Sequence, residues 1–334
     1  MDKKVSLTGD RPTGPLHIGH YFGSLVSRKE LEDEYESFVM IADVQALTDH
    51  FNEPEKVRDN VTEVALDYLA SGLNPEKTTF FIQSQIPQIA ELTVFFSNLV
   101  TINTLKRNPT VKSEIAEKKD LFGAKGEKLT YGFLGYPVSQ AADITIVRAD
   151  IVPVGQEQLP MIELTREIIE KFHRIYKTNI FPLPQAKLSK APRILGIDGN
   201  AKMSKTLNNA IFLNDNPEEI RGKIKSAKTD SHSTVAFDPK KRPEISNLVL
   251  IYSLIHSITP QGAVKEIGNL NYVAFKSKLA DDLIKFLEPT REKRKELEKN
   301  PEKVMSILNE GTKKTLIRAE ETMSLVKKAM QINY

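Results

Sequence analysis

The sequence contains no cysteine and no tryptophan. Without cysteine, the chain can form neither a disulfide nor a thiolate-ligated metal site. Without tryptophan, any indole fluorescence from a complex must come from a ligand. The sequence also lacks a long uncharged apolar stretch, and its first ten residues, MDKKVSLTGD, lack the apolar core of a signal peptide. We therefore expect no membrane-spanning helix, no membrane partner and a cytoplasmic location.

The 334 residues are 40% hydrophobic and 27% charged, which is typical of a globular protein large enough for two domains. The net charge of +3 is unevenly distributed. Residues 1–200 carry 23 Lys and Arg against 27 Asp and Glu, a balance of −4, which leaves 24 against 17, a balance of +7, for residues 201–334. This asymmetry favours a C-terminal half that meets a polyanion. On charge alone, an ordinary solvated surface explains it equally well.

Strand-like and helix-like segments alternate in the first two hundred residues. Short apolar runs predict strands at Val5–Gly9, Phe38–Asp43, Thr78–Gln83 and Ile151–Val154. Apolar residues at helical spacing predict helices at Leu16–Glu34, Pro54–Ser71 and Gln156–Tyr176. This alternation indicates a parallel sheet covered on both faces, which binds ligands at the C-terminal ends of its strands. Gly9, Asp43 and Gly155 fall at such ends.

The remaining segments are mainly helical. Residues from about 89 to 136 interrupt the alternation and read as a helical insertion. Beyond about Ala210, helices are predicted at Pro217–Ser226, Ile245–Ser257, Tyr272–Leu287 and Pro301–Met330. The charged run REKRKELEK, residues 291–299, is most simply a solvated helix face. We therefore predict an α/β parallel-sheet domain over residues 1–206, with its insertion near 89–136, followed by an α-helical domain over residues 207–334.

Two short motifs carry most of the chemical information. The first is HIGH, in which His17 and His20 lie three residues apart on one face of the first turn of a helix. A helix N-terminus already attracts anions, so this pair predicts a phosphate site; two surface histidines are the alternative. For a metal pair, no third ligand is evident nearby, so no metal site is expected. The second is KMSKT, in which Lys202 and Lys205 lie in a glycine-flanked loop. Those lysines are suited to neutralising a pyrophosphate, unless they are merely solvated.

In this order and context, the two motifs resemble the signature motifs of class I aminoacyl-tRNA synthetases. Within that class, several further stretches are similar to bacterial tryptophanyl-tRNA synthetases and together cover most of the chain. They are GDRPTGPLHIGHYFGSL, ADVQALTD, FIQSQIP, RNPTVK, YPVSQAADI, IVPVGQEQ, GNAKMSKTLNNAI and KIKSAKTDS. The resemblance implies a Rossmann-like catalytic domain, an α-helical domain that binds the tRNA anticodon, and a homodimer.

The resemblance also implies an activity and its site residues. The enzyme would activate L-tryptophan with ATP, accompanied by Mg²⁺, and load it onto tRNA(Trp). The catalytic residues would be His17, His20, Lys202 and Lys205. The ATP site would comprise Arg11, Pro12, Thr13, Gly19, His20, Lys112, Gly155, Gln156, Glu157, Ile194, Lys202, Met203, Ser204, Lys205 and Thr206. Tryptophan would be bound by Asp143 at the indole N–H, by Tyr136, Gln140 and Gln158 at the ammonium end, and by the apolar walls Leu7, Val152 and Val154.

The sequence departs from the family pattern at two positions. Thr206 replaces the usual Ser but keeps the hydroxyl. Gln140 occupies a position where some members carry Met and where tyrosyl-tRNA synthetases carry Gln, whereas Leu7 replaces a Tyr that is usual in tyrosyl enzymes. A tyrosine–tRNA ligase is therefore one alternative. A small-molecule nucleotidyltransferase and a non-catalytic, synthetase-like binding protein are the others. For Asp143 itself, a helix cap or a structural hydrogen bond is the alternative to substrate binding.

Overall fold

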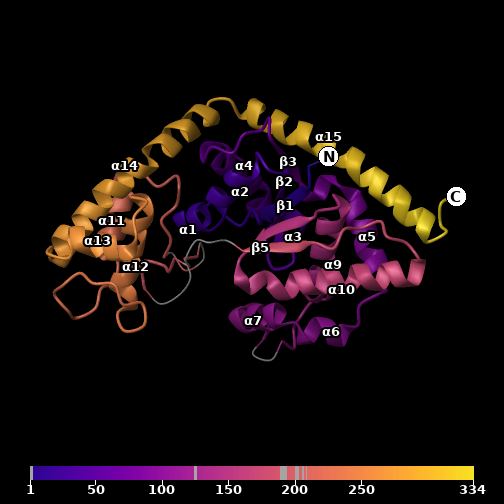
Figure 1. The fold of residues 1–334 in the computed structure, drawn as a ribbon, viewed down its shortest axis with the longest axis horizontal. Coiled ribbons are helices and arrows are strands. Elements are labelled where there is room, and N and C mark those ends of the chain that lie inside the picture. The colour runs from indigo at the N-terminus through magenta and orange to yellow at the C-terminus, as the bar shows by residue number, and fades with distance from the viewer. Residues whose placement is uncertain (1–2, 124–125, 189–193, 200–202, 205–206, 208) are drawn as a thin grey trace.

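The computed structural model describes residues 3–123, 126–188, 194–199, 203–204, 207 and 209–334 (Figure 1). Five parallel strands form one sheet in the order β3-β2-β1-β4-β5. The strands are β1 (Val5–Asp10), β2 (Glu36–Ile41), β3 (Thr78–Ile82), β4 (Ile151–Val154) and β5 (Gln185–Leu188). The predicted parallel sheet is confirmed. β5 was not predicted, because this edge strand is mostly exposed and carries no continuous apolar run.

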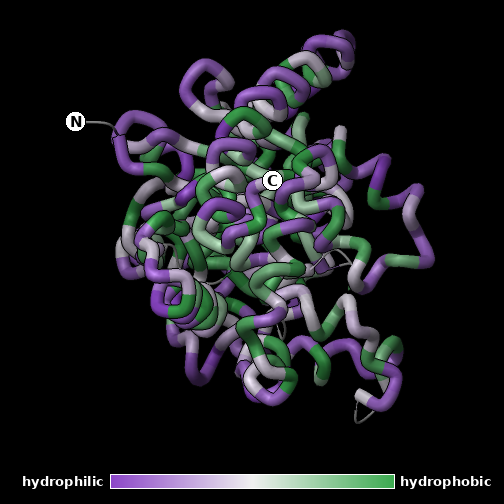
Figure 2. The backbone as a smooth tube through the Cα atoms, turned by 90° about the vertical axis from the view of Figure 1, so that its right-hand side faces the viewer, coloured by the Kyte–Doolittle hydropathy of each residue, from purple (hydrophilic) through white to green (hydrophobic). Residues whose placement is uncertain are grey.

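Alternate residues of the strands enter two different apolar clusters, as a sheet buried on both faces requires. In β2, Val39 and Ile41 pack into one cluster, whereas Phe38 and Met40 pack into the other. The first cluster includes α4 (Pro54–Ala70) and continues into the C-terminal helices. The second lies against the helices on the opposite face. Figure 2 shows hydrophobic segments concentrated inside the molecule and hydrophilic ones outside.

The helix predicted over residues 16–34 is present but irregular. It consists of α1 (Ile18–His20), a π-helical turn at Tyr21–Leu25, and α2 (Val26–Leu31). Such π-turns within helices are frequent at functional sites. A further short helix, α3 (Asp43–Ala46), begins directly after β2. The last three residues of the HIGH motif form α1, and His17 directly precedes it.

The connection from β3 to β4 contains the predicted helical insertion. Its helices are α5 (Pro87–Ser97), α6 (Ile102–Arg107), α7 (Pro109–Glu117), α8 (Lys119–Phe122) and α9 (Tyr131–Ile146). Helix α10 (Leu159–Tyr176) then follows β4. Figure 1 shows α6 and α7 at the bottom of the molecule, beyond α10. Helices α9 and α10, in contrast, pack in the core of the sheet half.

The C-terminal half is helical, as predicted. Its helices are α11 (Pro217–Ser226), α12 (Pro243–Ile255), α13 (Pro260–Ile267), α14 (Tyr272–Glu298) and α15 (Pro301–Ala329). Helices α11 to α14 gather at one end of the molecule, and α15 runs back across the sheet half (Figure 1). The expectation of a solvated face at residues 291–299 is wrong for two side chains. Arg291 and Arg294 are buried, because each finds acceptors inside the fold.

Helix α15 covers β3, the strand at one edge of the sheet. A Cβ atom built on Gly311 would lie 1.9 Å from the carbonyl oxygen of Phe80, so only glycine permits this approach. The hydroxyl of Thr312 accepts a hydrogen bond from the backbone N–H of Ile82 at 3.4 Å. An otherwise open sheet edge is thereby closed. The last helix thus packs on the sheet half, and the domain boundary at residues 206–207 stays a prediction.

Candidate active site

Polar residues gather at the C-terminal edge of the sheet. Asp10 ends β1, Asp43 follows β2, Gln83 follows β3 and Gly155 follows β4. In the sheet, β2 and β3 lie on one side of β1, and β4 and β5 lie on the other. The direction in which successive strands are added therefore reverses at the β1–β4 pair. Ligands of doubly wound sheets bind at such a reversal. The structure therefore places Gly9, Asp43 and Gly155 at the predicted edge.

The two signature motifs meet beside this reversal. The backbone N–H of Ile18 donates to the carbonyl of Ile211 at 3.0 Å, and that of Leu213 donates to the carbonyl of Leu16 at 2.9 Å. The segment that follows KMSKT is thereby paired with HIGH. A Cβ atom built on Gly19 would lie 3.8 Å from Cβ of Met203. Met203 of KMSKT therefore lies close to HIGH, although the two motifs are almost two hundred residues apart in the sequence.

Within HIGH, the two imidazoles are adjacent. The ring centroids of His17 and His20 are 3.8 Å apart, and Nδ1 of His20 accepts a hydrogen bond from the backbone N–H of His17 at 3.3 Å. His17 is buried, while His20 is half-buried. Lys202, Lys205 and Thr206 lie outside the described residues, so their predicted roles stay predictions.

Two asparagines that the sequence analysis missed hold the segments around KMSKT. The side-chain oxygen of Asn209 accepts from the backbone N–H of Ser204 at 2.8 Å. That of Asn247, on α12, accepts from the backbone N–H of Leu195 at 2.8 Å. Ile194 and Met203 are buried in the same apolar cluster as Leu16 and Ile18. The C-terminal helices thus help to fix one wall of the predicted ATP site.

Arg11 is held by an acid that the sequence analysis also missed. Its Nη2 lies 2.6 Å and 2.8 Å from the two carboxylate oxygens of Asp49, and Nζ of Lys118 lies 2.8 Å from the same carboxylate. Burial alone would raise the pKa of Asp49, but the two cations outweigh it and lower that pKa to about 2. Arg11 and the helical insertion are therefore joined through one ionised carboxylate.

The other residues predicted around ATP lie after β1, after β4 and, for Lys112, on α7. Pro12 is buried, Thr13 and Gly155 are half-buried, and Gln156, Glu157 and Lys112 are exposed. The hydroxyl of Thr110, at the start of α7, donates to the carbonyl of Glu157 at 2.9 Å. The insertion therefore contacts the loop after β4. Among the described residues, no hydrogen bond or ion pair joins the Lys112 side chain to this loop.

Asp143 is the most deeply buried acid predicted to bind substrate. It lies within α9 rather than at its cap, and burial raises its pKa to about 7. The amide nitrogen of Gln83 donates to both of its carboxylate oxygens, at 2.8 Å and 3.0 Å. The side-chain oxygen of Gln83 in turn accepts from the backbone N–H of Gln45 at 3.0 Å. Asp143 is therefore not a helix cap, but it does make a structural hydrogen bond, so that alternative to substrate binding stays open. The sequence analysis did not single out its partner Gln83.

The apolar walls predicted for tryptophan share one cluster. Leu7 and Val152 are buried in it, and Val154 packs against it. Tyr136 is buried, and burial together with the nearby Glu114 carboxylate raises its pKa. The side chains at positions 140 and 158, both glutamines, are half-buried. Among the seven residues predicted to bind tryptophan, Asp143 is the one acid, and the apolar walls belong to the cluster that also contains its neighbours in α9.

A separate cavity of about 230 Å³ opens beside Gln83. Its lining comes from the start of α3, the end of β3, α5 and one residue of α9. None of the seven residues predicted to bind tryptophan lines it. The lining residues are Val44, Gln83, Ser84, Ile86, Pro87, Ile89, Ala90, Thr93 and Ser139.

Comparison with known proteins identifies the family. Residues 2–288 match the family described as class I tRNA synthetases (W and Y). The chain belongs to this family. A tryptophan–tRNA ligase of Streptococcus mutans is 49% identical to this synthetase over 100% of both chains. Another, from Lactococcus lactis, is 48% identical over 100% of this chain and 99% of its own.

Solved structures agree with this membership. A tryptophanyl-tRNA synthetase of Campylobacter jejuni, complexed with ADP and tryptophan, has a TM-score of 0.83 and 29% identity and covers 98% of this synthetase and 99% of its own chain. One from Mycoplasma pneumoniae has a TM-score of 0.84 and 28% identity, covering 98% of both. A tyrosyl-tRNA synthetase of Aeropyrum pernix, at 19% identity and a TM-score of 0.69, shares the fold.

Proposed function

We propose that this synthetase is a tryptophan–tRNA ligase, which activates L-tryptophan with ATP and transfers it to tRNA(Trp). The observation that carries the proposal is the backbone pairing of HIGH with the segment after KMSKT, which brings Met203 close to Gly19 at the C-terminal edge of the sheet. Tryptophan, rather than tyrosine, is favoured by full-length identity of 49% to a tryptophan–tRNA ligase. Leu7, where tyrosyl enzymes usually carry Tyr, agrees with that choice.

In the first step, the tryptophan carboxylate attacks the α-phosphorus of ATP. The bond to the bridging oxygen of the β-phosphate breaks, so tryptophanyl-adenylate forms and pyrophosphate leaves. The substrate supplies the nucleophile, so the protein contributes positioning and charge stabilisation. His17 and His20 hold the phosphates, and Lys202 and Lys205 stabilise the departing pyrophosphate. Mg²⁺ accompanies the ATP phosphates, because magnesium is usually held by phosphates with one or two carboxylates and not by an all-protein cage.

On the amino-acid side, the indole lies against α9, beside Asp143. The Asp143 carboxylate accepts its N–H, and the cluster containing Leu7 and Val152 covers its faces. Tyr136 and the glutamines at positions 140 and 158 bind the ammonium group. Because Gln83 fixes both oxygens of Asp143, the acceptor is oriented before the substrate arrives.

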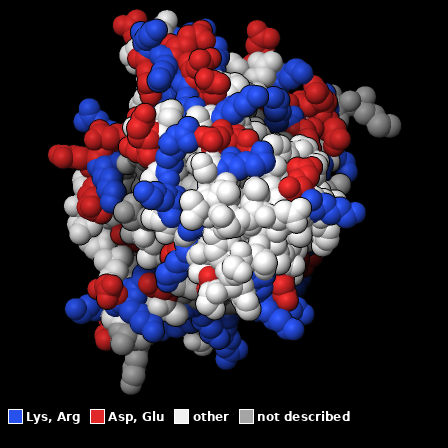
Figure 3. Space-filling view, turned by 90° about the vertical axis from the view of Figure 1, so that its left-hand side faces the viewer, with Lys and Arg blue, Asp and Glu red and all other residues white. Residues whose placement is uncertain are grey.

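In the second step, the 2′-hydroxyl of the terminal tRNA ribose attacks the adenylate carbonyl, and AMP leaves. Residues 207–334, with their excess of positive charge, bind the anticodon arm. Figure 3 views the molecule from the end where α11 to α14 lie, where a broad uncharged area is bordered by Lys and Arg side chains and by Asp and Glu side chains.

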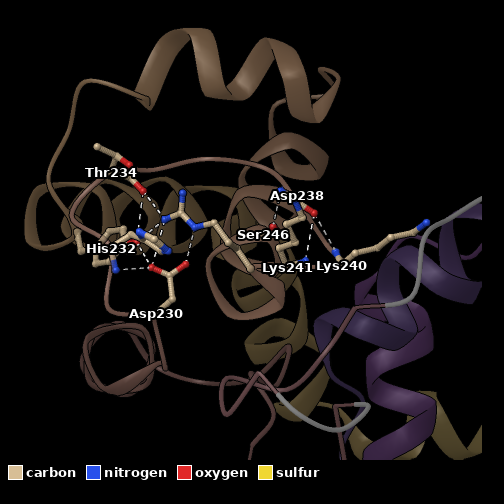
Figure 4. Close-up of polar contacts among 9 residues, drawn as sticks. Asp230, His232, Thr234, Asp238, Lys240, Lys241 and Ser246 are labelled. Atoms are coloured by element: carbon tan, nitrogen blue, oxygen red, sulfur yellow. Dashed lines mark hydrogen bonds and ion pairs between the residues drawn. The ribbon is translucent and has the colours of Figure 1, made fainter.

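One loop at this end is built to present lysines. Arg242 donates to Asp230 at 2.6 Å, to the carbonyl of Thr234 at 2.6 Å, and to the hydroxyl of Tyr272 at 2.7 Å (Figure 4). In the turn just before Arg242, the Asp238 carboxylate accepts the backbone N–H groups of Lys240 and Lys241 at 3.2 Å and 3.1 Å. Both lysines, at positions 240 and 241, are exposed. We assign this loop to tRNA phosphates.

The enzyme acts as a homodimer in the cytoplasm. The helices of the insertion carry large apolar side chains on their surface, and a second copy would cover them. Val94 is 61% exposed and Ile102 is 62% exposed. Within the described residues, no helix is long and apolar enough to span a membrane. Sedimentation of the wild type and of Val94→Asp measures the assembly: the wild type should sediment as a dimer, and the variant should weaken it.

The decisive experiment is amino-acid-dependent ATP–pyrophosphate exchange with tryptophan and with tyrosine. Tryptophan should drive exchange, and tyrosine at equal concentration should not. Faster exchange with tyrosine would make the chain a tyrosine–tRNA ligase. Binding without exchange would indicate a synthetase-like binding protein, and exchange that needs no amino acid would indicate a nucleotidyltransferase.

A further inference from the structure

Asp67 connects two distant parts of the chain. It lies within α4, and its side chain is fully buried. One carboxylate oxygen accepts a hydrogen bond from the backbone N–H of Leu16 at 2.6 Å. The other accepts from Nη1 of Arg294, which belongs to α14. A single carboxylate therefore links a C-terminal helix to the residue directly before His17.

Arg294 is fixed on several sides. Its side chain is 4% exposed. Nη2 pairs with the carboxylate of Glu63 at 2.5 Å, Nη1 also donates to the carbonyl of Glu63 at 3.2 Å, and Nε donates to Glu298 at 2.9 Å. The guanidinium fork can serve these acceptors together, whereas a lysine offers a single point of charge. The Arg294 side chain is thus held in place by acceptors on α4 and on its own helix.

The opposite side of Leu16 is also fixed. Its carbonyl accepts from the backbone N–H of Leu213, in the segment after KMSKT. Its side chain is fully buried. The entry to HIGH is therefore held between Asp67 on one side and that segment on the other. Without the hydrogen bond to Asp67, the backbone before His17 is anchored only by the segment after KMSKT.

We propose that Arg294 is a positioning residue for tryptophan activation: through Asp67 it fixes the backbone at Leu16, and so the rings of His17 and His20. This inference rests on the proposed function, which gives those two rings their place at the phosphates. Arg294 acts through Asp67 and is not a catalytic residue. A misplacement of about 1 Å at reacting groups can lower a rate by about 10²-fold, so a small loss of order here has a measurable consequence.

Arg318 provides a matched control. It also joins a C-terminal helix, α15, to the sheet half, donating to the carbonyl of Val147 at 2.7 Å and pairing with Glu36 at 2.8 Å. Both partners lie at the N-terminal edge of the sheet, because Glu36 starts β2 and Val147 precedes β4. Removal of Arg318 breaks a bridge of the same chemical kind on the side away from the active site.

The test compares Arg294→Gln, Arg294→Lys and Arg318→Gln by tryptophan-dependent pyrophosphate exchange. Arg294→Gln should lower kcat about 10- to 100-fold, because the phosphate-holding rings lose their placement. KM for tryptophan should change less than twofold, and Arg294→Lys should recover part of the rate. Arg318→Gln should stay within about twofold of the wild type in kcat. Equal kcat losses for Arg294→Gln and Arg318→Gln would overturn the proposal.

A second readout does not depend on activity. Hydrogen exchange at the Leu16 amide should become at least tenfold faster in Arg294→Gln, because its acceptor Asp67 loses its anchor. In Arg318→Gln it should stay within about twofold of the wild type. Unchanged protection in Arg294→Gln would overturn the positioning role even if the enzyme were slower. A wild type without tryptophan-dependent exchange would instead refute the proposed function, and the exchange rate of this amide would still test the connection.

Discussion

The amide nitrogen of Gln83 lies 2.8 Å and 3.0 Å from the two carboxylate oxygens of Asp143. The orientation of that amide is fixed in turn, because its oxygen accepts the backbone N–H of Gln45. Residues of α3 and of the turn after β3 therefore define where the Asp143 carboxylate on α9 points. Under the proposed function, a substrate N–H meets an acceptor that is already oriented, and selection for a donor in the substrate depends on this acid.

Replacement of Asp143 by alanine should weaken tryptophan binding by about 1–3 kcal/mol, because the indole N–H is left buried without an acceptor. The loss should be smaller for 1-methyl-tryptophan, which lacks that donor. Fluorescence titration measures both, since the protein itself contains no tryptophan. Asp150→Ala removes a carboxylate that accepts from Val5 N–H at the opposite edge of the sheet, and it should leave both affinities unchanged. Equal losses for the two ligands would contradict the assigned hydrogen bond.

Tryptophan affinity should depend on pH around neutrality. Burial raises the pKa of Asp143 to about 7, so the carboxylate gains a proton as the pH falls through that value. The charged acceptor binds the indole N–H more strongly than the protonated acid does. The dissociation constant should therefore increase below pH 7, by up to about tenfold per pH unit, and level off above it. Asp143→Asn should flatten this profile, and a profile that keeps its slope in the variant would assign the titration to another group.

The sequence predicts the sheet and both motifs because these features are local. Four strands are runs of apolar residues, and HIGH and KMSKT are contiguous. What it misses depends on contacts between distant segments. Gln83 acquires a role only when β3 and α9 meet, and Asn247 only when α12 meets the segment before KMSKT. The burial of Arg294 in a run of charged residues likewise follows from the acids of α4, which no local pattern reveals.

The close approach of α15 to β3 makes a stability prediction. Gly311→Ala places a methyl group where the carbonyl oxygen of Phe80 lies, so helix and strand must separate. Overpacking of this kind costs about 1–3 kcal/mol in the free energy of unfolding, measured by urea denaturation. Gly222→Ala, in α11, meets nothing within 4 Å and should instead gain about 0.5–1 kcal/mol from helix propensity. An unchanged stability in Gly311→Ala would mean that α15 readily shifts away.

Lys240 and Lys241, in the loop anchored by Arg242, should contribute to tRNA binding and not to tryptophan activation. The double substitution Lys240→Ala, Lys241→Ala should weaken tRNA binding and reduce its salt dependence, because up to two phosphate contacts are lost. Tryptophan-dependent pyrophosphate exchange, measured without tRNA, should be unchanged. Lys77→Ala removes an exposed lysine paired with Asp33 in the sheet half, and it should leave the salt slope unaltered. A loss of exchange that parallels the loss of tRNA binding would contradict a separate tRNA surface.

The sharpest test of the chemistry concerns Lys205, which the sequence places beside Ser204 in the motif that contacts HIGH. If its charge acts mainly on the departing pyrophosphate, it stabilises the transition state more than the bound substrates. Lys205→Ala should then lower the rate of adenylate formation by about 10²–10³-fold, by analogy with the loss of one oxyanion donor. Tryptophan affinity should hardly change, and apparent ATP affinity should change less than the rate.

Lys205→Arg keeps the charge but changes its shape, so it should restore only part of the rate. Pre-steady-state measurement of adenylate formation separates the chemical step from product release. Lys225, an exposed lysine near the end of α11, serves as the control, and its replacement by alanine should leave the rate unchanged. An unaltered rate in Lys205→Ala would reduce KMSKT to a surface feature. It would also mean that the close approach of Met203 to Gly19 does not serve adenylate formation.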